Sequence, residues 1–246
     1  LEITYAHPTT DYAHRITESS VLAGAVRYMD AGAIDNTDIN GNKIGTFRPR
    51  NYVYEIGWGQ SINDLTDAER DITLGVNLKY LNSDLIAHAD GWASDVGMQA
   101  HYTDTLMPFN FSAVLQNFGK GQKFDKVRDT LPFRGKFGSS IQPRPFLTLA
   151  LEGFLPVSGA PYGALGLEFM LESSKRAKAF LRAGYNSRAS FSGLEGIRGV
   201  TAGIGVKLTD FSVDYAFAPM GILGNTHRVG LTWTLPSKHS RRFRER

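Results

Sequence analysis

Apolar and polar residues alternate one by one along many segments of this chain. In residues 51–62 the apolar positions fall on every second residue, and the positions between them are mostly polar or glycine: Tyr52, Tyr54, Ile56, Trp58 and Ile62 alternate with Asn51, Val53, Glu55, Gly57, Gly59 and Ser61. The same split recurs in residues 71–82, 163–171, 200–208 and 227–235. Successive side chains of a strand point to opposite faces, so each segment predicts a β-strand with one apolar and one polar face.

The pattern predicts about 14 strands, joined by connections of alternating length. We place the strands at 1–6, 12–17, 20–30, 50–62, 69–82, 92–104, 107–118, 131–141, 145–155, 162–172, 178–187, 199–208, 211–218 and 226–235. Long connections are expected at 31–49, 83–91, 119–130 and 188–198, and short ones at 105–106, 142–144 and 209–210. Long external loops with tight periplasmic turns are typical of outer-membrane barrels. An even strand number would place both chain ends on the periplasmic side.

Three features favour a membrane barrel over a soluble β-sandwich. Many segments approach the 9–11 residues of a tilted membrane-spanning strand. The polar face is rich in Gly, Ser, Thr and Asn, and aromatic residues lie on the apolar face near strand ends: Tyr52, Tyr80, Trp92, Tyr102, Tyr185, Phe217 and Trp233. We therefore predict an all-β fold, a transmembrane antiparallel up-and-down β-barrel over residues 1–235, in the outer membrane of a Gram-negative bacterium. The soluble sandwich stays the alternative.

Composition narrows the function classes. No apolar run approaches the roughly 18 residues of a membrane-spanning helix, and the chain has no cysteine. The net charge of +3 comes from residues 237–246, where five basic residues stand against Glu245, so the remainder carries 22 bases and 23 acids. We expect a basic periplasmic tail at 236–246 and no nucleic-acid partner. Any secretory signal is expected to have been removed or to lie outside this sequence.

The C-terminal stretch resembles a known family. Residues 213–229, Val-Asp-Tyr-Ala-Phe-Ala-Pro-Met-Gly-Ile-Leu-Gly-Asn-Thr-His-Arg-Val, are similar to the end of PorV/PorQ-type outer-membrane proteins, relatives of the FadL-like barrels. The family-like positions in this block are Asp214, Tyr215, Pro219, Gly221, Gly224, His227 and Arg228. Weaker similarity runs in order through Gly75 and Lys79, residues 95–97, residues 131–138, Glu168 and Phe169, and residues 181–185.

The resemblance implies a FadL-like barrel of fourteen strands with one of two roles. The first is a part in type IX-like secretion, with secreted cargo or secretion-complex proteins as partners. The second is transport of long-chain fatty acids or other hydrophobic small molecules. The family's N-terminal plug segment, with its Asn-Pro-Ala element, has no counterpart here, and this departure weakens a plug-dependent transport mechanism.

Charged residues on the predicted polar face form the candidate site. They are Glu55, Asp71, Lys79, Asp95, Arg134, Lys136, Glu168, Arg182, Lys207, Asp214 and Arg228, five acids against six bases. Because buried charges are usually paired, this balance predicts a salt-bridge network that fills the lumen. A ligand or translocation role for the same charges is the alternative.

Two motifs suggest chemistry but lack essential parts. Residues 36–41, Asn-Thr-Asp-Ile-Asn-Gly, resemble the start of a calcium loop, but Asn36 stands at the first position and Phe47 at the twelfth, where a bidentate Glu is needed. We interpret them as a turn-rich external loop. The six histidines show no metal-ligand spacing, and Ser190 and Ser192 lie in a long loop without a nucleophile elbow or a nearby His. We expect no catalytic site, metal or cofactor.

Two functional hypotheses remain. A partner-binding barrel would use the loops at 31–49, 119–130 and 188–198 as its docking surface. A transporter needs an apolar pocket in the lumen, and Val53, Leu81 and Phe180 are among the few apolar residues that the alternation turns inward.

Overall fold

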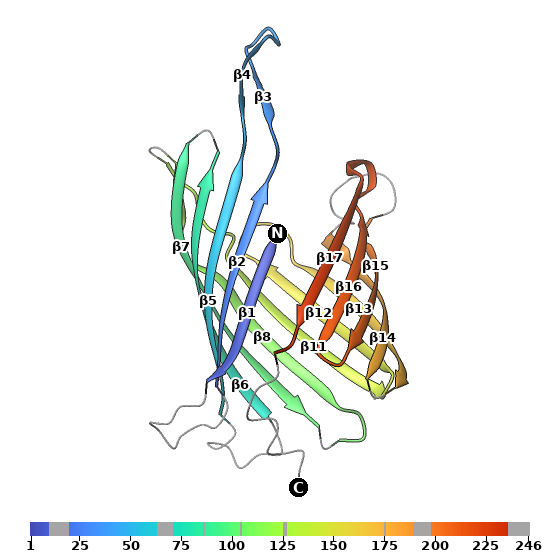
Figure 1. Ribbon diagram of the computed structural model, residues 1–246. Helices are drawn as coiled ribbons and strands as arrows, with labels where there is room; N and C mark the ends of the chain where they lie inside the picture. The colour runs from blue at the N-terminus through green and yellow to red at the C-terminus, as the bar shows by residue number, and fades with distance from the viewer. Residues whose placement is uncertain are drawn as a thin grey trace. The chain divides into compact units, whose positions relative to one another are not determined.

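The computed structural model describes residues 1–9, 20–62, 71–85, 87–103, 105–124, 127–174, 176–188 and 198–235 (Figure 1). Thirteen described strands follow one another in chain order in one antiparallel sheet. They are β1 (Glu2–Thr9), β2 (Ser20–Asp30), β5 (Arg50–Ser61), β6 (Asp71–Asp84), β7 (His88–Tyr102), β8 (Phe109–Lys120), β11 (Arg134–Arg144), β12 (Leu147–Pro156), β13 (Tyr162–Ser174), β14 (Ala177–Asn186), β15 (Val200–Leu208), β16 (Phe211–Pro219) and β17 (Asn225–Trp233).

The prediction of an all-β chain with an antiparallel meander is confirmed. Thirteen of the predicted strands correspond to strands of the sheet, most of them displaced by about two residues at an end. The predicted strand at 12–17 and the basic tail at 236–246 lie outside the described residues. The count of fourteen, and with it the side of the membrane on which the two chain ends lie, stays a prediction.

Some of the expected connections are confirmed and others are wrong. Residues 209–210 form a tight turn, as predicted, whereas the turn expected at 142–144 lies at 145–146 because β11 continues to Arg144. Most of the connection expected at 188–198 lies outside the described residues. The long loop expected at 83–91 is wrong, because β6 continues to Asp84 and β7 begins at His88. Two predicted loops contain strands: β3 (Ile34–Thr37) and β4 (Lys43–Phe47) in 31–49, and β9 (Lys123–Phe124) and β10 (Val127–Arg128) in 119–130.

The chain forms two compact units. The first comprises residues 1–102, 111–137 and 154–160. In it β2, β5, β6 and β7 pair in register, so that Leu22, Trp58, Val76 and Val96 form one row across the strands and Ala25, Glu55, Lys79 and Ala93 form another on the opposite face. The β3–β4 hairpin continues past the neighbouring ends of β6 and β7 (Figure 1).

The second unit comprises residues 103–110, 138–153 and 161–246. Its strands β13 to β17 pair with neighbours in chain order. Leu165, Leu181, Ile204, Tyr215 and Val229 lie on one face, whereas Glu168, Arg182, Gly203, Asp214 and Arg228 lie on the other. Both units therefore separate apolar from polar side chains, as the alternation of the sequence predicts.

Candidate functional site: the charged face of the sheet

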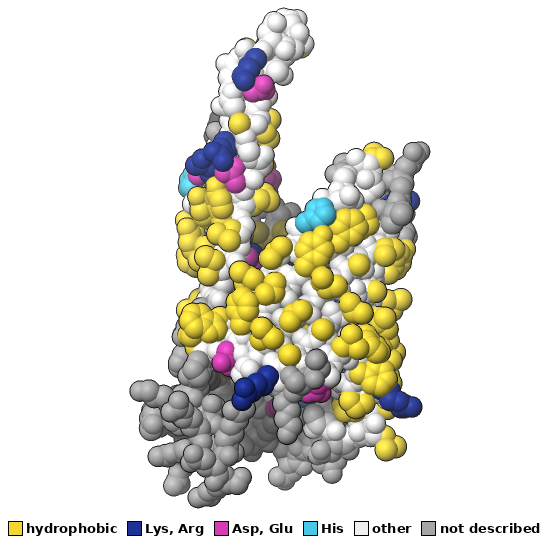
Figure 2. Space-filling view, turned by 45° about the vertical axis from the view of Figure 1, so that its right-hand side comes forward, with side chains coloured by type: hydrophobic (Ala, Val, Ile, Leu, Met, Phe, Trp, Pro, Cys, Tyr) yellow, Lys and Arg dark blue, Asp and Glu magenta, His cyan; other side chains and the backbone are white. Residues whose placement is uncertain are grey.

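Burial is inverted relative to a water-soluble protein. Among the described residues, the buried hydrophobic side chains are Ala89, Ala93, Ala100 and Phe154, whereas the buried polar ones are Ser20, Lys79, Ser83 and Asp95. The large apolar side chains are exposed: Ile56 by 53%, Leu78 by 50% and Ile204 by 56%. Figure 2 shows hydrophobic side chains spread over the outer surface of the strands. The opposite face of the strands, in contrast, carries charged groups.

A row of aromatic rings crosses the exposed face of the first unit. Tyr28 of β2 lies 4.8 Å from Tyr52 of β5, centroid to centroid, and Tyr80 of β6 lies 5.0 Å from Trp92 of β7. Tyr54 connects the two pairs, with its ring 6.3 Å from both Tyr52 and Tyr80. Such contacts follow from the register, because cross-strand neighbours on one face lie about 5 Å apart. The row is adjacent to the strand ends that carry the β3–β4 hairpin.

Lys79 and Asp95 form the most buried ion pair of the first unit. Their side chains are 9% and 12% exposed, and Lys79 Nζ lies 2.6 Å from Asp95 Oδ2. Asn117 of β8 completes the cluster: its backbone N–H donates to Asp95 Oδ1 at 2.8 Å, and its side-chain oxygen accepts from Lys79 at 3.1 Å. Asn117 adopts a φ of +62°, a left-handed conformation that Asn tolerates better than most residues. Both charges are therefore paired and hydrogen-bonded.

Glu55 is paired with a cation that the sequence interpretation missed. Arg27 of β2 places Nη1 2.8 Å from Glu55 Oε1, and Asn77 of β6 donates to Glu55 Oε2 at 2.7 Å. Arg27 also lies 3.3 Å from Glu2. The alternation of residues 20–30 was the signal that could have found Arg27, since it shares the face of Ala25, which is opposite Glu55 in the register.

In the second unit Arg182 joins two carboxylates from different strands. Its Nε lies 2.6 Å from Glu168 Oε2 on β13, and its Nη1 lies 2.6 Å from Asp214 Oδ1 on β16. β14, which carries Arg182, is separated from β16 by β15. The arginine can reach across because Gly203 and Gly205 of β15 leave the polar face free of side chains. A Cβ on Gly205 would overlap the Asp214 carboxylate and come within 3.0 Å of Arg182 Nη1.

The other predicted charges lie outside these clusters. Asp71 accepts from the Ser61 hydroxyl at 3.1 Å, Arg134 donates to Gln116 at 2.9 Å, and Lys136 lies 5.0 Å from the centre of the Phe154 ring. Lys207 and Arg228 are exposed, and neither forms an ion pair with a described residue. Among the described residues the predicted charges thus gather in separate clusters, around Lys79 and Glu55 in the first unit and around Arg182 in the second.

The family-like block forms the last hairpin of the chain. Tyr215 OH lies 2.8 Å from His227 Nδ1 across β16 and β17. Pro219 pairs with Asn225 at the end of the ladder, and the connection contains a 3₁₀ turn, η3 (Gly221–Leu223). Gly221 and Gly224 have φ values of +61° and +92°, which glycine adopts without a steric penalty. The glycines of this block therefore have a clear structural role in a tight connection.

The segment with calcium-loop character is a hairpin turn. Gly41 N–H donates to the Asp38 carbonyl at 3.0 Å, Asp38 N–H donates to the Asn42 carbonyl at 2.9 Å, and Gly41 has a φ of +83°. This is the three-residue β-hairpin loop with a left-handed glycine. Hydrogen bonds from the side chain and then from the backbone of Asn42 lower the pKa of the Asp38 carboxyl. Asp38 therefore stabilises the turn itself.

Comparisons with known proteins identify no family. No protein-family model matches the chain, and no curated protein matches it. Within the described residues, no three His, Asp or Glu side chains are grouped as a metal site would require. Among the same residues no helix has the length and apolar character needed to cross a bilayer. The features of the described residues that bear on function are therefore the two faces of the sheet.

Proposed function

We propose that this chain is a β-barrel of a bacterial outer membrane. The observation that carries the proposal is the inverted burial: apolar side chains are exposed across both units while Lys79 and Asp95 are buried. Soluble monomers rarely expose apolar patches larger than a few hundred Å². Covering such a surface with lipid is favourable by about 25 cal/mol per Å² of apolar area. A lipid bilayer is an environment in which every exposed row of apolar side chains is in contact with apolar groups.

The positions of aromatic and charged groups fit the same proposal. The row from Tyr28 to Trp92 would lie at the lipid–water boundary, where aromatic girdles occur in outer-membrane barrels. Just beyond it, Asp30 at the end of β2 pairs with Arg48 at 2.8 Å and lies 3.7 Å from Arg50. These charges would lie in water, and the β3–β4 hairpin would project outside the cell.

The role that we propose is partner binding of the PorV/PorQ type, in a type IX-like secretion system. Its supports are the resemblance of residues 213–229 and the pairing of charges on the polar face. Charges that neutralise one another make a strongly ion-selective pore a poor alternative. The β3–β4 hairpin supplies a hydrogen-bonded external element, with Ile39 at its tip fully exposed. The proposed docking surface comprises this hairpin together with residues 119–130 and 188–198.

The transporter hypothesis has weaker support. Val53 and Leu81 are opposite each other on the polar face of the first unit, next to Gly91. Gln122 lies against Gly91, since a Cβ there would be 3.0 Å from Gln122 Cγ. In the second unit the Arg182 guanidinium lies over the Phe180 ring at 5.0 Å. The inward apolar groups are thus small in number and partly covered by polar side chains.

Deletion of the hairpin tests the proposal. Ala31 N–H donates to the Pro49 carbonyl at 3.0 Å, so residues 32–48 can be replaced by Asn-Gly, which favours a two-residue hairpin turn. We expect the variant to stay in the outer-membrane fraction, to keep heat-dependent gel migration, and to lose the secretion proteins that co-purify with the wild type. Unchanged co-purification would contradict the partner-binding role. Extraction of the wild type without detergent would contradict the membrane barrel.

A further inference from the structure

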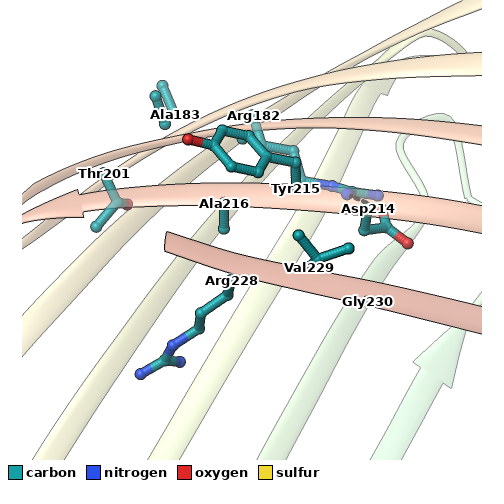
Figure 3. Close-up of a pocket in the computed structure, with 11 residues that line it drawn as sticks. Arg182, Ala183, Thr201, Asp214, Tyr215, Ala216, Arg228, Val229 and Gly230 are labelled. Carbon is teal, nitrogen blue, oxygen red and sulfur yellow. Dashed lines mark hydrogen bonds and ion pairs between the residues drawn. The ribbon is translucent and has the colours of Figure 1, made fainter. Parts of the chain in front are cut away.

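A hollow on the polar face of the second unit has no assigned role. It has a volume of about 370 Å³ and lies over β14 to β17. Its lining includes the small residues Gly203, Ala216 and Gly230, and Arg182, Asp214 and Arg228 supply its charged side chains. Figure 3 shows Arg182 directed toward Asp214, whereas the guanidinium of Arg228 points away from both. The volume falls within the roughly 300–1,000 Å³ typical of ligand pockets.

The charges around the hollow are unevenly distributed. Arg182 shares its single positive charge between Glu168 and Asp214, each at 2.6 Å, so that group carries one carboxylate charge in excess. Asp214 contacts Arg182 through Oδ1, and its side chain is 38% exposed, so the other carboxylate oxygen can accept a hydrogen bond. Arg228 forms no ion pair or hydrogen bond with the residues that the structure describes. One side of the hollow is therefore an acceptor and the other a donor.

The geometry points to a binding site for a small zwitterion, the class of a free α-amino acid. Its ammonium group donates to Asp214, and its carboxylate accepts the paired donors of Arg228, a bidentate geometry that guanidinium groups favour. Ala216 is opposite Arg228, and Asp214 is opposite Gly230. Asp214 and Arg228 are thus diagonal neighbours on one face of the ladder, and both line the hollow. A ligand with an ammonium group and a carboxylate contacts both once the exposed Arg228 side chain turns toward the hollow.

Opposite charges on the ligand are essential to this inference. A simple anion would bind Arg228 but would be repelled by the excess carboxylate charge of the Glu168–Arg182–Asp214 group. A simple cation would bind Asp214 but would be repelled by the positive charge of Arg228. Direct pairing of Asp214 with Arg228 competes only weakly, because an exposed ion pair contributes little stability. The site therefore selects ligands that carry both a positive and a negative group.

Calorimetric titration of the detergent-folded full chain tests the site. The probes are L-glutamine, N-acetyl-L-glutamine, which lacks the ammonium, and L-glutaminamide, which lacks the carboxylate. We expect saturable binding of L-glutamine and at least tenfold weaker binding of both derivatives. Arg228→Gln and Asp214→Asn should each weaken L-glutamine binding at least tenfold. Lys207→Gln, which removes a different exposed cation from the polar face of β15, should leave it unchanged.

Three results would overturn the inference: no binding of L-glutamine by the folded protein, equal binding of a derivative, or equal binding by Arg228→Gln. Heat-dependent gel migration shows whether each variant has folded. If Asp214→Asn does not fold, Arg228→Gln still tests the site, because it leaves the Arg182 ion pairs intact. The inference goes beyond the proposed function. Failure of the chain to insert into lipid vesicles would count against the membrane barrel, whereas loss of zwitterion binding by inserted protein would count against this site alone.

Discussion

Gly205 shows how a residue without a side chain can decide an ion pair. A Cβ at this position would overlap the Asp214 carboxylate and approach Arg182 Nη1 to 3.0 Å. We predict that Gly205→Ala separates Arg182 from Asp214 and lowers the free energy of unfolding by about 1–2 kcal/mol, since the pair is partly exposed. Denaturant unfolding of the refolded protein measures the loss.

Gly230→Ala is the matched control for this change. It adds the same methyl group to the polar face of β17, but the nearest atom there is Asp214 Cβ at 3.9 Å, an ordinary contact. We expect its free energy of unfolding to stay within about 0.5 kcal/mol of the wild type. Equal losses in both variants would show that a general strand effect, not the ion pair, explains the result.

Lys79 illustrates the cost of an unpaired buried charge. Lys79→Met leaves Asp95 buried without its cation, and breaking a buried pair costs about 3–5 kcal/mol. Replacing both partners, Lys79→Met with Asp95→Leu, removes the charge and should recover most of the stability. Unfolding midpoints of the three proteins in urea give the comparison. If the single variant is as stable as the double variant, the pair is not a stabilising unit.

At the scale of elements, the β3–β4 hairpin should respond to pH through Asp38. The folded pKa of Asp38 is lowered, so its stabilising hydrogen bonds are complete above the unfolded pKa of about 3.9 and are lost as the pH falls through the lower folded value. We predict that the amide shifts of Asn40 and Asn42, whose N–H groups donate to Asp38 at 2.8 Å, are constant from neutral pH to about 4 and change below it.

Asp38→Asn should abolish this titration while the rest of the sheet is unaffected. The Asp35→Asn variant serves as a control on the same hairpin, because Asp35 pairs with Lys43 and accepts no bond from the turn amides. A turn that titrates identically in all three proteins would show that another group controls it.

Sequence alternation predicted the strands best where one face is apolar. It located β5, β13 and β15 almost to the residue, because each carries a continuous apolar row. It failed at 83–91, where β6 and β7 extend beyond the apolar region. Their ends there carry polar residues, such as Asp84, His88 and Asp90. It also missed β3 and β4, since a two-stranded ribbon exposed on both faces has no apolar face to reveal it.

The same reasoning predicted which charges share the polar face but not how they pair. Face membership follows from the period of two, whereas pairing depends on register between strands and on neighbours two strands away. Arg182 reaches Asp214 only because β15 has glycines between them. Neutral partners such as Asn77 and Asn117 were also missed. A search for charged residues does not include the amide side chains that form hydrogen bonds with those charges.

At the scale of the whole molecule, the exposed apolar rows should determine where the protein resides. Leu78 lies mid-strand on β6 beside Ile56 and is half exposed, so in the proposed barrel Leu78→Arg places a charge near the bilayer midplane. Such a charge destabilises a membrane barrel by about 2–4 kcal/mol. In a soluble sheet the same change would be tolerated or would improve solubility. We therefore predict slower insertion into phosphatidylcholine vesicles and a lower unfolding midpoint in the bilayer.

Ile44→Arg provides the control that separates the two environments. Ile44 is 64% exposed on β4, more than Leu78, but it lies on the hairpin that the proposal places in water. Burial in the protein alone predicts that Leu78→Arg costs little more than Ile44→Arg, because both side chains have half or more of their area exposed. Burial in lipid predicts that only Leu78→Arg impairs insertion. Equal behaviour of the two variants in vesicles would therefore contradict a membrane location for this sheet.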